Sequence, residues 1–373
     1  MKSVPGPNQT LWPGIKGLMT ERKLNEYITL GRSGLIVSPF CLGTMTFGND
    51  RWGSSDDESR RIFDGFVAAG GNFVDVADIY ADGKSEEVLG RFIGDAKLRD
   101  KMVVATKFTF AVEEGNPNSG GNGRKNIYRA LEGSLRRLNM DYVDLYWMHV
   151  WDTMTPVEEV VETLSTLTRA GKIRYYAFSD VPAWYVARAV TLAQERGLEP
   201  PIALQLEYSM VERNIEREHV PAARELGLGI CPWSPLASGF LTGKYTREGA
   251  SSAKGSRLDV LQNSENPVFH KFTERNWKIL ETLQEVSKQI GRSPAQVALN
   301  WAATQPGITS PIIGATKLKQ LEDNLAALSF EIPAELRAKL DEVSALEAIH
   351  PYMFFAGLLQ GRVRGGLRVT PWS

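Results

Sequence analysis

Cysteine and histidine are scarce in this sequence, and their placement argues against two kinds of site. The 373 residues include two cysteines, Cys41 and Cys231, and four histidines that lie far apart along the chain. None of them has the spacing of a metal site, and two cysteines in separate apolar stretches do not build a disulfide framework. We therefore expect two reduced, buried thiols, no metal centre and a cytoplasmic location.

Long apolar runs and an excess of positive charge are also missing. No segment reaches the about 20 apolar residues that a membrane-spanning helix needs, and residues 1–23 contain no continuous apolar core of a secretory signal. The net charge of −1 results from 43 Lys and Arg against 44 Asp and Glu. Nucleic-acid-binding proteins usually carry a basic surplus, so we expect a protein that neither binds nucleic acid nor inserts into a membrane.

Eight short β-rich segments are present instead, most of them about thirty residues apart, which is the length of one strand–helix–strand unit. They are residues 39–45, 72–78, 102–107, 143–149, 173–179, 202–208, 228–235 and 308–315. Amphipathic stretches such as 56–70 and 124–139 lie between them and end near Gly or Asn, which stop helices. Eight strands alternating with helices favour a (β/α)₈ TIM barrel over an open doubly wound sheet.

Residues 27–38, YITLGRSGLIVS, predict a short β-hairpin that could close the bottom of this barrel. The last interval of the barrel is longer than the others, with a polar loop at 238–260 followed by two helical patterns at 266–291 and 294–305. No linker separates two domains. We expect an N-terminal extension at 1–25, one barrel with long C-terminal-face loops at 26–345, and a C-terminal tail at 346–373.

The segment GGNFVDVADIYADGKSEEVLG begins as a buried strand and yet contains two carboxylates, Asp75 and Asp78. A buried carboxylate costs several kcal/mol, on the order of the desolvation penalty for one ion, unless another group pairs with it. Lys107 closes the next predicted strand and is therefore well placed to neutralise Asp75. We expect this pair to be buried at the end of two neighbouring strands.

The C-terminal ends of the barrel strands bring further polar residues to one rim, which is where TIM-barrel chemistry takes place. Asp75, Lys107 and His149 close the second, third and fourth strands, and Tyr80 follows Asp75 in the next loop. Each residue alone has an ordinary structural explanation, as a turn, a solvated end or a satisfied histidine. Together they form a general acid: Lys107 favours the Tyr80 phenolate, and His149 orients a substrate oxygen beside it.

Seven motifs between Tyr27 and Asp341 resemble those of the aldo-keto reductase superfamily, in its bacterial and channel-β-like branch, and they follow the same order. They are FVDVADIYADGKSEEVLG, VVATK, DYVDLYWMH, GKIRYYAFSD, ALQLEYS, CPWSPLASGFLTGKY and IIGATKLKQLEDNL. The resemblance implies a (β/α)₈ barrel that uses NADP(H) to reduce aldehydes and ketones to alcohols. It also implies that Asp75, Tyr80, Lys107 and His149 are the catalytic residues. The G-x-G-x-x-G fingerprint of a Rossmann fold is missing between a strand and a helix.

The same resemblance assigns cofactor contacts along the rim. At the nicotinamide end Trp233 would stack on the ring, and the other contacts would be Gly43, Thr44, Met45, Asp75, Ser179, Asp180 and Gln205. The pyrophosphate would meet Ser234, Pro235, Leu236, Ser238, Gly239, Lys244 and Arg257, and the adenosine would meet Gly314, Thr316, Lys317, Gln320, Asp323 and Asn324. Asp180 departs from the commoner Asn of the motif, which leaves its oxygen as an acceptor and removes the amide donor.

The stretch GATKLKQLEDN is a strand end that enters a helix, so its backbone N–H groups are expected to be free for an anion. Lys317 and Lys244 add positive charge nearby, and we therefore expect NADP rather than NAD. The aromatic residues Trp52, Phe108, Trp151, Tyr352 and Phe354 lie in the loops and the tail that could form the pocket walls. They suggest an apolar or aromatic carbonyl substrate, although the tail could instead pack against the side of the barrel.

Two other functions fit parts of the sequence. A cofactor-binding regulatory subunit with little turnover, like the channel β subunits, would keep the fold, but such proteins tend to have lost the histidine that stands here as His149. A class I aldolase would use Lys107 as a covalent nucleophile, which leaves Tyr80 and the adenosine-type motif without a role. Borohydride trapping of a Lys107–carbonyl adduct would favour the aldolase. An oligomer is also compatible with the sequence.

Overall fold

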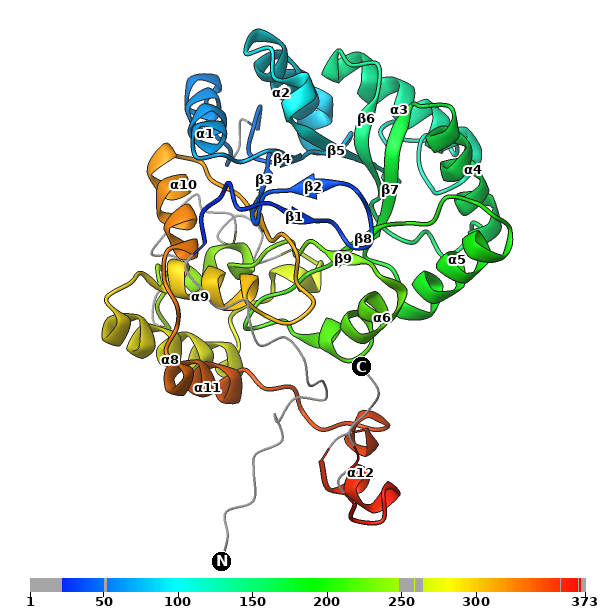
Figure 1. The fold of residues 1–373 in the computed structure, drawn as a ribbon. Helices are drawn as coiled ribbons and strands as arrows, with labels where there is room; N and C mark the ends of the chain where they lie inside the picture. Colours follow the sequence, from blue (N-terminus) through cyan, green and yellow to red (C-terminus); the bar gives the residue numbers. More distant parts are fainter. Residues whose placement is uncertain are drawn as a thin grey trace, which may run out of the picture.

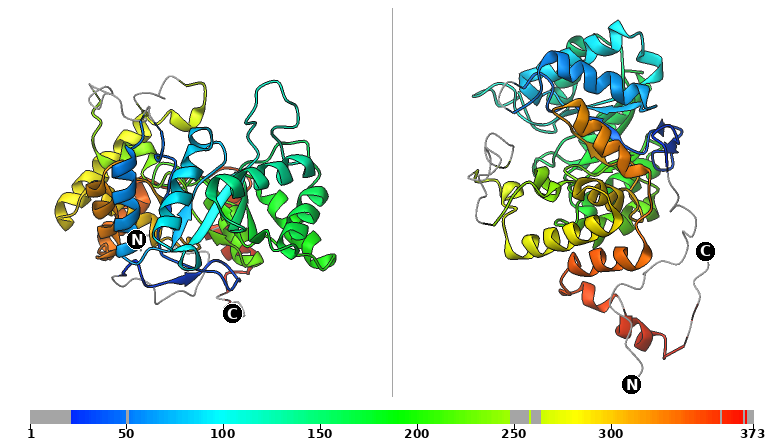
Figure 2. Two further views of the ribbon diagram at one scale, coloured as in Figure 1. Left: turned by 90° about the horizontal axis from the view of Figure 1, so that it is seen from above. Right: turned by 90° about the vertical axis from the view of Figure 1, so that its left-hand side faces the viewer.

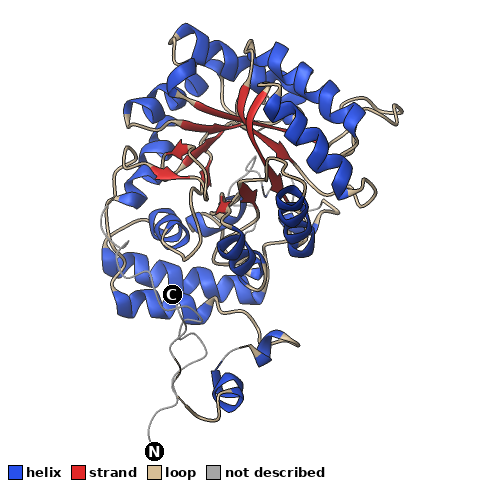
Figure 3. Cartoon of the chain, turned by 45° about the vertical axis from the view of Figure 1, so that its right-hand side comes forward, coloured by secondary structure: helices blue, strands red, loops and turns tan. Residues whose placement is uncertain are grey.

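Eight parallel strands curl into a barrel, and helices surround its outer surface (Figures 1 and 3). A computed structural model of the chain describes residues 22–49, 52–247, 258, 264–355, 357–367 and 369. The strands follow one another around the barrel in the order β10-β3-β4-β5-β6-β7-β8-β9. Each of the eight predicted segments overlaps one of these strands, so the predicted (β/α)₈ barrel is confirmed.

The barrel strands are β3 (Cys41–Gly43), β4 (Phe73–Asp75), β5 (Val103–Phe108), β6 (Val143–Met148), β7 (Ile173–Ser179), β8 (Ala203–Gln205), β9 (Gly229–Ile230) and β10 (Ile312–Ile313). The helices are α1 (Asp56–Ala68), α2 (Lys84–Asp95), α3 (Arg124–Leu138), α4 (Val157–Arg169), α5 (Ala183–Glu195), α6 (His219–Leu226), α8 (Glu274–Ile290), α9 (Pro294–Ala303), α10 (Leu318–Leu325), α11 (Ala334–Val343) and α12 (Gly357–Val363).

Backbone hydrogen bonds between the first and last parts of the sheet complete the barrel. The N–H of Ile312 donates to the carbonyl of Pro232 at 2.7 Å, and the N–H of Thr309 donates to the carbonyl of Ile230 at 2.8 Å. On its other side β10 pairs with β3, so that Ile312 lies opposite Cys41. The sheet therefore has no open edge between β9 and β10.

Alternate residues of every strand face the barrel interior. Cys41, Phe73, Ala105, Trp147 and Cys231 belong to one buried cluster, which fills the inside of the barrel. Their strand neighbours face outward and pack against the helices. The two thiols are free and buried, as expected, and burial raises the pKa of Cys41 well above its usual value.

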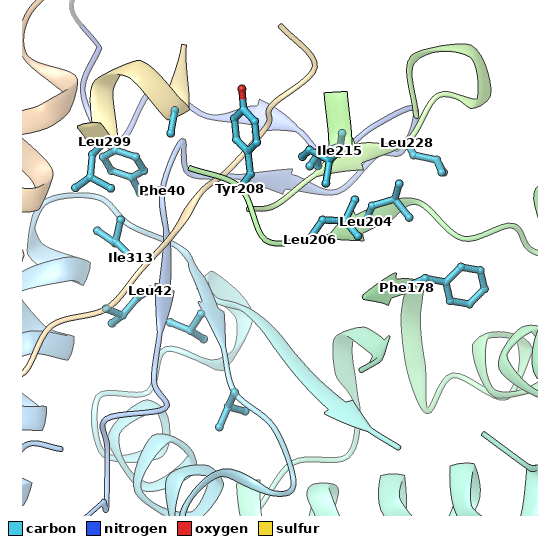
Figure 4. Close-up of a cluster of buried hydrophobic side chains, with 14 of the residues drawn as sticks. Phe40, Leu42, Phe178, Leu204, Leu206, Tyr208, Ile215, Leu228, Leu299 and Ile313 are labelled. Carbon is cyan, nitrogen blue, oxygen red and sulfur yellow. The ribbon is translucent and has the colours of Figure 1, made fainter. Parts of the chain in front are cut away.

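A second and larger cluster fills the layer between the strands and the helices. Leu42, Phe178, Leu204 and Ile313 are part of it (Figure 4). Leu42 and Ile313 are the outward neighbours of interior residues, which explains why a single strand contributes to both clusters.

The helices begin and end where local chemistry favours it. The Ser55 hydroxyl accepts a hydrogen bond from the N–H of Glu58 at the start of α1, and Ser293 and Gln296 form a capping box at the start of α9. Asn139 adopts the left-handed conformation (φ 53°) after α3. The predicted stop of the helix in 124–139 is therefore confirmed, because Asn tolerates this conformation better than most residues.

The predicted hairpin is also present, and it closes the N-terminal end of the barrel (Figure 2). Its strands are β1 (Ile28–Thr29) and β2 (Ile36–Val37), and Leu30 packs on the interior cluster. Gly31 has a φ of +61°, and a Cβ at this residue would lie 2.6 Å from the carbonyl oxygens of Gly227 and Ile202. Only glycine fits a turn so close to the barrel backbone.

The C-terminal tail extends away from the ring of barrel helices (Figure 1). The Tyr352 hydroxyl donates to Glu218 at 2.6 Å, and the Arg217 guanidinium lies 5.2 Å from the centre of the Tyr352 ring. The described part of the tail thus contacts the region around α6. None of the described helices has both the length and the apolar character that crossing a membrane requires.

Candidate active site

The rim residues follow directly from the alternation along the strands. Each barrel strand has an interior residue, and the residue two positions later again faces inward, at the C-terminal end of the barrel. These rim residues are Gly43, Asp75, Lys107, His149, Ser179, Gln205, Trp233 and Gly314, two positions after Cys41, Phe73, Ala105, Trp147, Ala177, Ala203, Cys231 and Ile312. All eight were among the residues predicted from the sequence.

Asp75 and Lys107 form the buried ion pair that the sequence predicts. The Lys107 ammonium donates to Asp75 Oδ2 and also to the carbonyl oxygen of Val76 at 2.9 Å. Gln205 Nε2 donates to Asp75 Oδ1 at 3.1 Å. Both oxygens of the carboxylate therefore have a partner, which is the condition under which a buried ion pair is tolerated.

Tyr80 lies on the other side of the Lys107 ammonium. The nitrogen of Lys107 is 3.2 Å from the Tyr80 hydroxyl and 4.7 Å from the centre of the phenol ring. Burial alone lowers the pKa of Lys107, but the Asp75 carboxylate and the Tyr80 hydroxyl outweigh burial and raise it to about 12. Lys107 is thus a permanent cation beside the phenol at neutral pH.

His149 follows β6 and is the fourth of the predicted catalytic residues, beside Asp75, Lys107 and Tyr80. Its ring packs edge-on against Tyr80, with 5.9 Å between ring centroids, and against Phe110, with 4.8 Å between centroids. Burial, assisted by the charge of Lys107, lowers the pKa of His149 well below its usual value. The imidazole is therefore neutral and has one N–H to donate. Its Nδ1 is buried without a hydrogen-bond partner among the described residues.

A cavity of about 1230 Å³ opens above this group and extends along the rim to α10. Its wall contains every residue of the described part of the chain that was predicted to be catalytic or to bind the cofactor, except Thr44 and Lys107. Thr44 is fully buried and its hydroxyl donates to the carbonyl oxygen of Asp75 at 3.0 Å, so it holds the loop after β3. Lys107 is fully buried below the cavity floor. Arg257 lies outside the described residues.

Asp180 and Trp233 are joined at the nicotinamide end predicted from the sequence. The indole N–H of Trp233 donates to Asp180 Oδ1 at 3.1 Å, and the Ser179 hydroxyl is 3.5 Å from Asp180 Oδ2. Burial raises the pKa of Asp180 to about 7, and Glu207 adds to the increase while the Trp233 hydrogen bond opposes it. A carboxylate at this place therefore changes its charge near neutrality.

The expectation of free backbone N–H groups at the start of α10 is wrong for two residues. The N–H of Leu318 donates to Glu58 Oε1 at 2.6 Å, and the N–H of Thr316 donates to Gln320 Oε1 at 2.8 Å. Side chains of the protein satisfy these groups, since a helix N-terminus recruits a carboxylate from a packed neighbouring helix when one is available. The Lys317 side chain does line the cavity.

The segment predicted to pass the pyrophosphate has a strained backbone. Ser234, Ala237 and Ser238 have φ values of 54°, 50° and 55°, in the left-handed region that non-glycine residues avoid. Each costs of order 1 kcal/mol or more, and such residues tend to cluster where a ligand is held. The Ser234 hydroxyl accepts a hydrogen bond from the N–H of Ser238 at 2.9 Å, which stabilises the turn.

The cavity fits an extended dinucleotide. Its volume of about 1230 Å³ exceeds the about 300–1,000 Å³ of sites for drug-sized ligands, and its wall includes both Tyr80 and Lys317. The side chains there also match the parts of such a ligand: an indole at Trp233, an ammonium at Lys244 and polar side chains at Gln320 and Asn324.

The prediction that Phe108 forms a pocket wall is wrong. Phe108 is fully buried and packs against Tyr146, with 4.8 Å between the ring centroids, in the layer between strands and helices. Since Lys107 faces inward, its neighbour must face outward. That signal was present in the sequence. Phe110 lies in the loop after β5, where the strand alternation no longer applies, and it lines the cavity together with the predicted Trp52.

Several cavity residues carried no signal in the sequence. Ile79 and Val150 stand next to catalytic candidates, and Asn266, Val268 and Phe269 belong to the segment before α8. Ser293, directly before α9, and Ala295 and Leu299 of α9 also line the cavity. Trp151 does not line this cavity and packs instead against Trp184, with 5.4 Å between ring centroids.

Known proteins have similar sequences over most of this chain. A profile of the aldo/keto reductase family matches residues 39–345. An uncharacterized oxidoreductase, YrpG, of Bacillus subtilis is 36% identical over 328 residues, which cover 85% of this chain and 95% of the relative. A probable voltage-gated potassium channel subunit beta of Oryza sativa subsp. japonica is 36% identical, with 87% and 98% covered. An aryl-alcohol dehydrogenase (NADP(+)) of Phanerodontia chrysosporium is 33% identical, with 86% of each chain covered.

The sequence motifs and the eight-stranded barrel thus agree with the match to this family. Because the family profile spans most of the chain, and relatives above 30% identity are covered over most of their length, the protein belongs to the aldo/keto reductase family.

Proposed function

We propose that this protein reduces aldehydes and ketones to alcohols with NADPH, and that Tyr80 is the general acid. The observation that carries the proposal is the Tyr80 hydroxyl at the cavity wall, 3.2 Å from the buried ammonium of Lys107. A phenol beside a permanent cation gives up its proton more readily than a free phenol. Membership of a family of oxidoreductases supports the reaction class.

Each side chain of the group has a distinct task in this reaction. NADPH, when bound, supplies the hydride. Tyr80 donates a proton to the substrate oxygen, Lys107 stabilises the phenolate that remains, and Asp75 keeps Lys107 charged and in place. Neutral His149 donates a hydrogen bond to the same oxygen and orients it toward Tyr80, which is how a positioned acid and donor lower the barrier of a carbonyl reaction.

The preference for NADPH over NADH follows from positive charge on the cavity wall. Lys317 and Lys244 both line it. Desolvation lowers the pKa of the Lys244 ammonium, a cost that an anion beside it offsets. The aryl-alcohol dehydrogenase relative is named as an NADP(+) enzyme, which also supports this preference.

Titration of Trp fluorescence with NADPH and NADH tests the cofactor preference. We expect tighter binding of NADPH, and we expect Lys317→Ala to weaken NADPH selectively by about 1–3 kcal/mol, the size of a lost charge-assisted contact. Lys278→Ala, at an exposed residue of α8, is the matched control. Equal dissociation constants for both cofactors in the unchanged protein would contradict the proposal.

Substrates of this enzyme should be apolar or aromatic carbonyl compounds. Trp52, Phe110, Ile79 and Val150 surround the space above Tyr80, and apolar side chains there favour a substrate with an apolar body. A panel of aliphatic, aromatic and polar aldehydes and ketones, followed by NADPH absorbance, tests this. Faster turnover of short polar aldehydes than of aromatic ones would contradict the proposed substrate class.

A regulatory subunit is the second candidate, because the chain is 36% identical to a probable channel subunit beta. Such a subunit would bind the cofactor tightly and turn it over slowly. His149 beside Tyr80 favours an enzyme. Multiple turnovers across the substrate panel would exclude the subunit, whereas tight NADPH binding with no turnover would support it.

A Schiff-base mechanism through Lys107 is less compatible with the geometry. Such a lysine must lose its proton before it attacks a carbonyl. The pKa of Lys107 is raised to about 12 by its neighbours despite burial, and its ammonium already donates to Asp75 and Val76. Borohydride treatment with a carbonyl substrate should therefore leave Lys107 unmodified.

A further inference from the structure

Asp180 places a carboxylate in the cavity wall beside the indole predicted to meet the nicotinamide ring. Its Oδ1 accepts the Trp233 N–H at 3.1 Å. Its backbone is held on both sides: the N–H donates to the carbonyl of Gln205 at 3.2 Å, and the carbonyl accepts from the N–H of Trp151 at 3.4 Å. Asp180 has a φ of 45°, a left-handed conformation in which Asp is tolerated better than most residues.

The charged groups around Asp180 leave it without an ion-pair partner of its own in the described part of the chain. Glu207, on the next strand end, is already paired with Lys271 at 2.7 Å. Lys107 acts on Asp180 only as a more distant charge, because its ammonium contacts Asp75. Glu212 and His219 line a smaller neighbouring cavity of about 390 Å³, which Asp180 also borders.

These surroundings make Asp180 titratable near neutral pH. Burial raises the pKa of Asp180 to about 7, with a further increase from Glu207 and opposing effects from Trp233, Ser179 and Lys107. The carboxyl is therefore mostly neutral at slightly acidic pH and mostly ionised at slightly alkaline pH. Either form can accept the Trp233 N–H, so the change of charge does not require the side chain to move.

The two redox forms of a nicotinamide respond differently to this charge. The oxidised ring carries a positive charge, whereas the reduced ring is neutral. A carboxylate in a partly desolvated wall attracts the oxidised ring and has little effect on the reduced ring. At a charge-to-ring distance of several ångströms and an effective dielectric constant of about 20, this attraction changes the ratio of the two affinities by about tenfold or more.

We propose that Asp180 sets the relative affinity of the site for oxidised and reduced nicotinamide: the ionised side chain favours the oxidised form, and the neutral side chain favours the reduced form. The proposal rests on the proposed function, since it requires a nicotinamide beside Trp233. When the pH falls, Asp180 becomes neutral. The site then no longer favours the oxidised cofactor, which is the form that carbonyl reduction produces.

Binding measurements without turnover test the proposal. NADP⁺ and NADPH are titrated against the Trp fluorescence of the full chain at about pH 6 and about pH 8.5, and the ratio of their dissociation constants is followed. Both forms carry the same 2′-phosphate, so its titration near pH 6 cancels in the ratio. We expect the preference for NADP⁺ over NADPH to increase by about tenfold from the lower to the higher pH.

Asp180→Asn keeps an oxygen for the Trp233 N–H and removes the charge. In this variant the ratio of the two dissociation constants should not change with pH, and it should equal the ratio that the wild type shows at about pH 6. Asp152→Asn is the matched control: it removes a carboxylate at the same end of the barrel, one that is held by Asn122 and Thr155 and does not line the main cavity. Its ratio should follow the wild type.

The outcomes separate the two proposals. If Asp180→Asn weakens both cofactor forms equally and leaves the pH dependence of the ratio intact, Asp180 only positions the cofactor and the inference is overturned, while the proposed function stands. If the wild-type protein binds neither form, the proposed function fails and the inference fails with it. A ratio that changes with pH in the wild type and in Asp152→Asn, but not in Asp180→Asn, supports both proposals.

Discussion

Asp75 and Asp78 are buried carboxylates in the same short segment, and their surroundings differ completely. The two residues are 2% and 3% exposed. Both oxygens of Asp75 accept hydrogen bonds, from Lys107 and Gln205. Neither oxygen of Asp78 accepts one from the described residues, and the nearby Glu86 carboxylate is engaged by Arg137 at 2.6 Å.

The ionisation of the two carboxyl groups differs because their hydrogen-bond partners differ. Burial raises the pKa of Asp75, and the Lys107 ammonium and Gln205 oppose the increase. Burial raises the pKa of Asp78 to about 7, and the charge of Glu86 adds to it. Equal burial thus produces a stable ion pair in one place and a titrating acid three residues away, because only Asp75 has a cation at hydrogen-bond distance.

The largest effect is expected for Asp75→Asn, which removes the charged partner of a buried cation. Lys107 would remain buried without a counter-charge, at a cost of about 3–5 kcal/mol in the free energy of unfolding. Urea denaturation measures this cost, and NADPH consumption should fall as well. Since Lys107→Met removes the stranded charge, the double variant Asp75→Asn/Lys107→Met should be less destabilised than the sum of the single variants. Unchanged stability and activity in Asp75→Asn would show that the pair is not needed.

Tyr80→Phe should reduce turnover strongly and leave cofactor binding intact. The change removes only the hydroxyl that the Asp75–Lys107 pair is proposed to activate, so turnover of an aldehyde should fall by roughly 10²–10⁴. NADPH titration and steady-state rates separate the two effects. Tyr128→Phe, at an exposed tyrosine of α3, is the control. A Tyr80→Phe enzyme with a nearly normal kcat would remove the proposed role of the pair.

Comparison of the wild type with Asp78→Asn should show how Asp78 changes the stability with pH. The direction of this change should be opposite to that of a carboxylate with an ion-pair partner. In the folded protein the pKa of Asp78 is about 7 instead of 3.8, so the folded state binds more protons than the unfolded state between these values. Stability is therefore lost as the pH rises through about 7. Between pH 5 and pH 8 the wild type should lose about 2–3 kcal/mol more than Asp78→Asn does.

Denaturation curves of both proteins at several pH values check this difference. Asp180, whose pKa is also raised to about 7 by burial, titrates in the same range and is present in both proteins, so their difference isolates Asp78. Parallel stability curves for the wild type and Asp78→Asn would contradict the raised pKa.

The smallest effect is expected where an ion pair is exposed. Lys172 and Glu132 are 3.4 Å apart, with side chains 44% and 47% exposed. Water already solvates both charges, so Glu132→Gln should change the free energy of unfolding by less than about 0.5 kcal/mol. Thermal melting measures it. A loss as large as that of Asp75→Asn would mean that burial does not distinguish these pairs.

The sequence allowed the barrel and its rim to be predicted for a physical reason. In a parallel strand the side-chain direction repeats every second residue, so an interior residue such as Phe73 or Ala105 also identifies the inward residue two positions later, Asp75 or Lys107. The same rule would have placed Phe108 outside the pocket. Its prediction as a wall residue was wrong because the aromatic character was weighed without the alternation.

Other features depend on elements that are distant in the sequence. Glu58 of α1 reaches the N–H of Leu318 across 260 positions of the chain, and no local pattern around α10 announces that its first donors are taken. The cavity wall contributed by Ser293 and Leu299 likewise arises from how α9 packs beside α10.

The sequence by itself determined the strand order, the inward-facing residues and the presence of a carboxylate, an ammonium, a phenol and an imidazole at one rim, because strand periodicity and chain connectivity are local properties. Pairing of Asp75 with Lys107 was predicted from the sequence, and only the tertiary structure decided that the similarly buried Asp78 has no hydrogen-bond partner among the described residues. Desolvation and hydrogen bonding depend on distances of a few ångströms between different strands and helices, and these distances are set when the barrel closes.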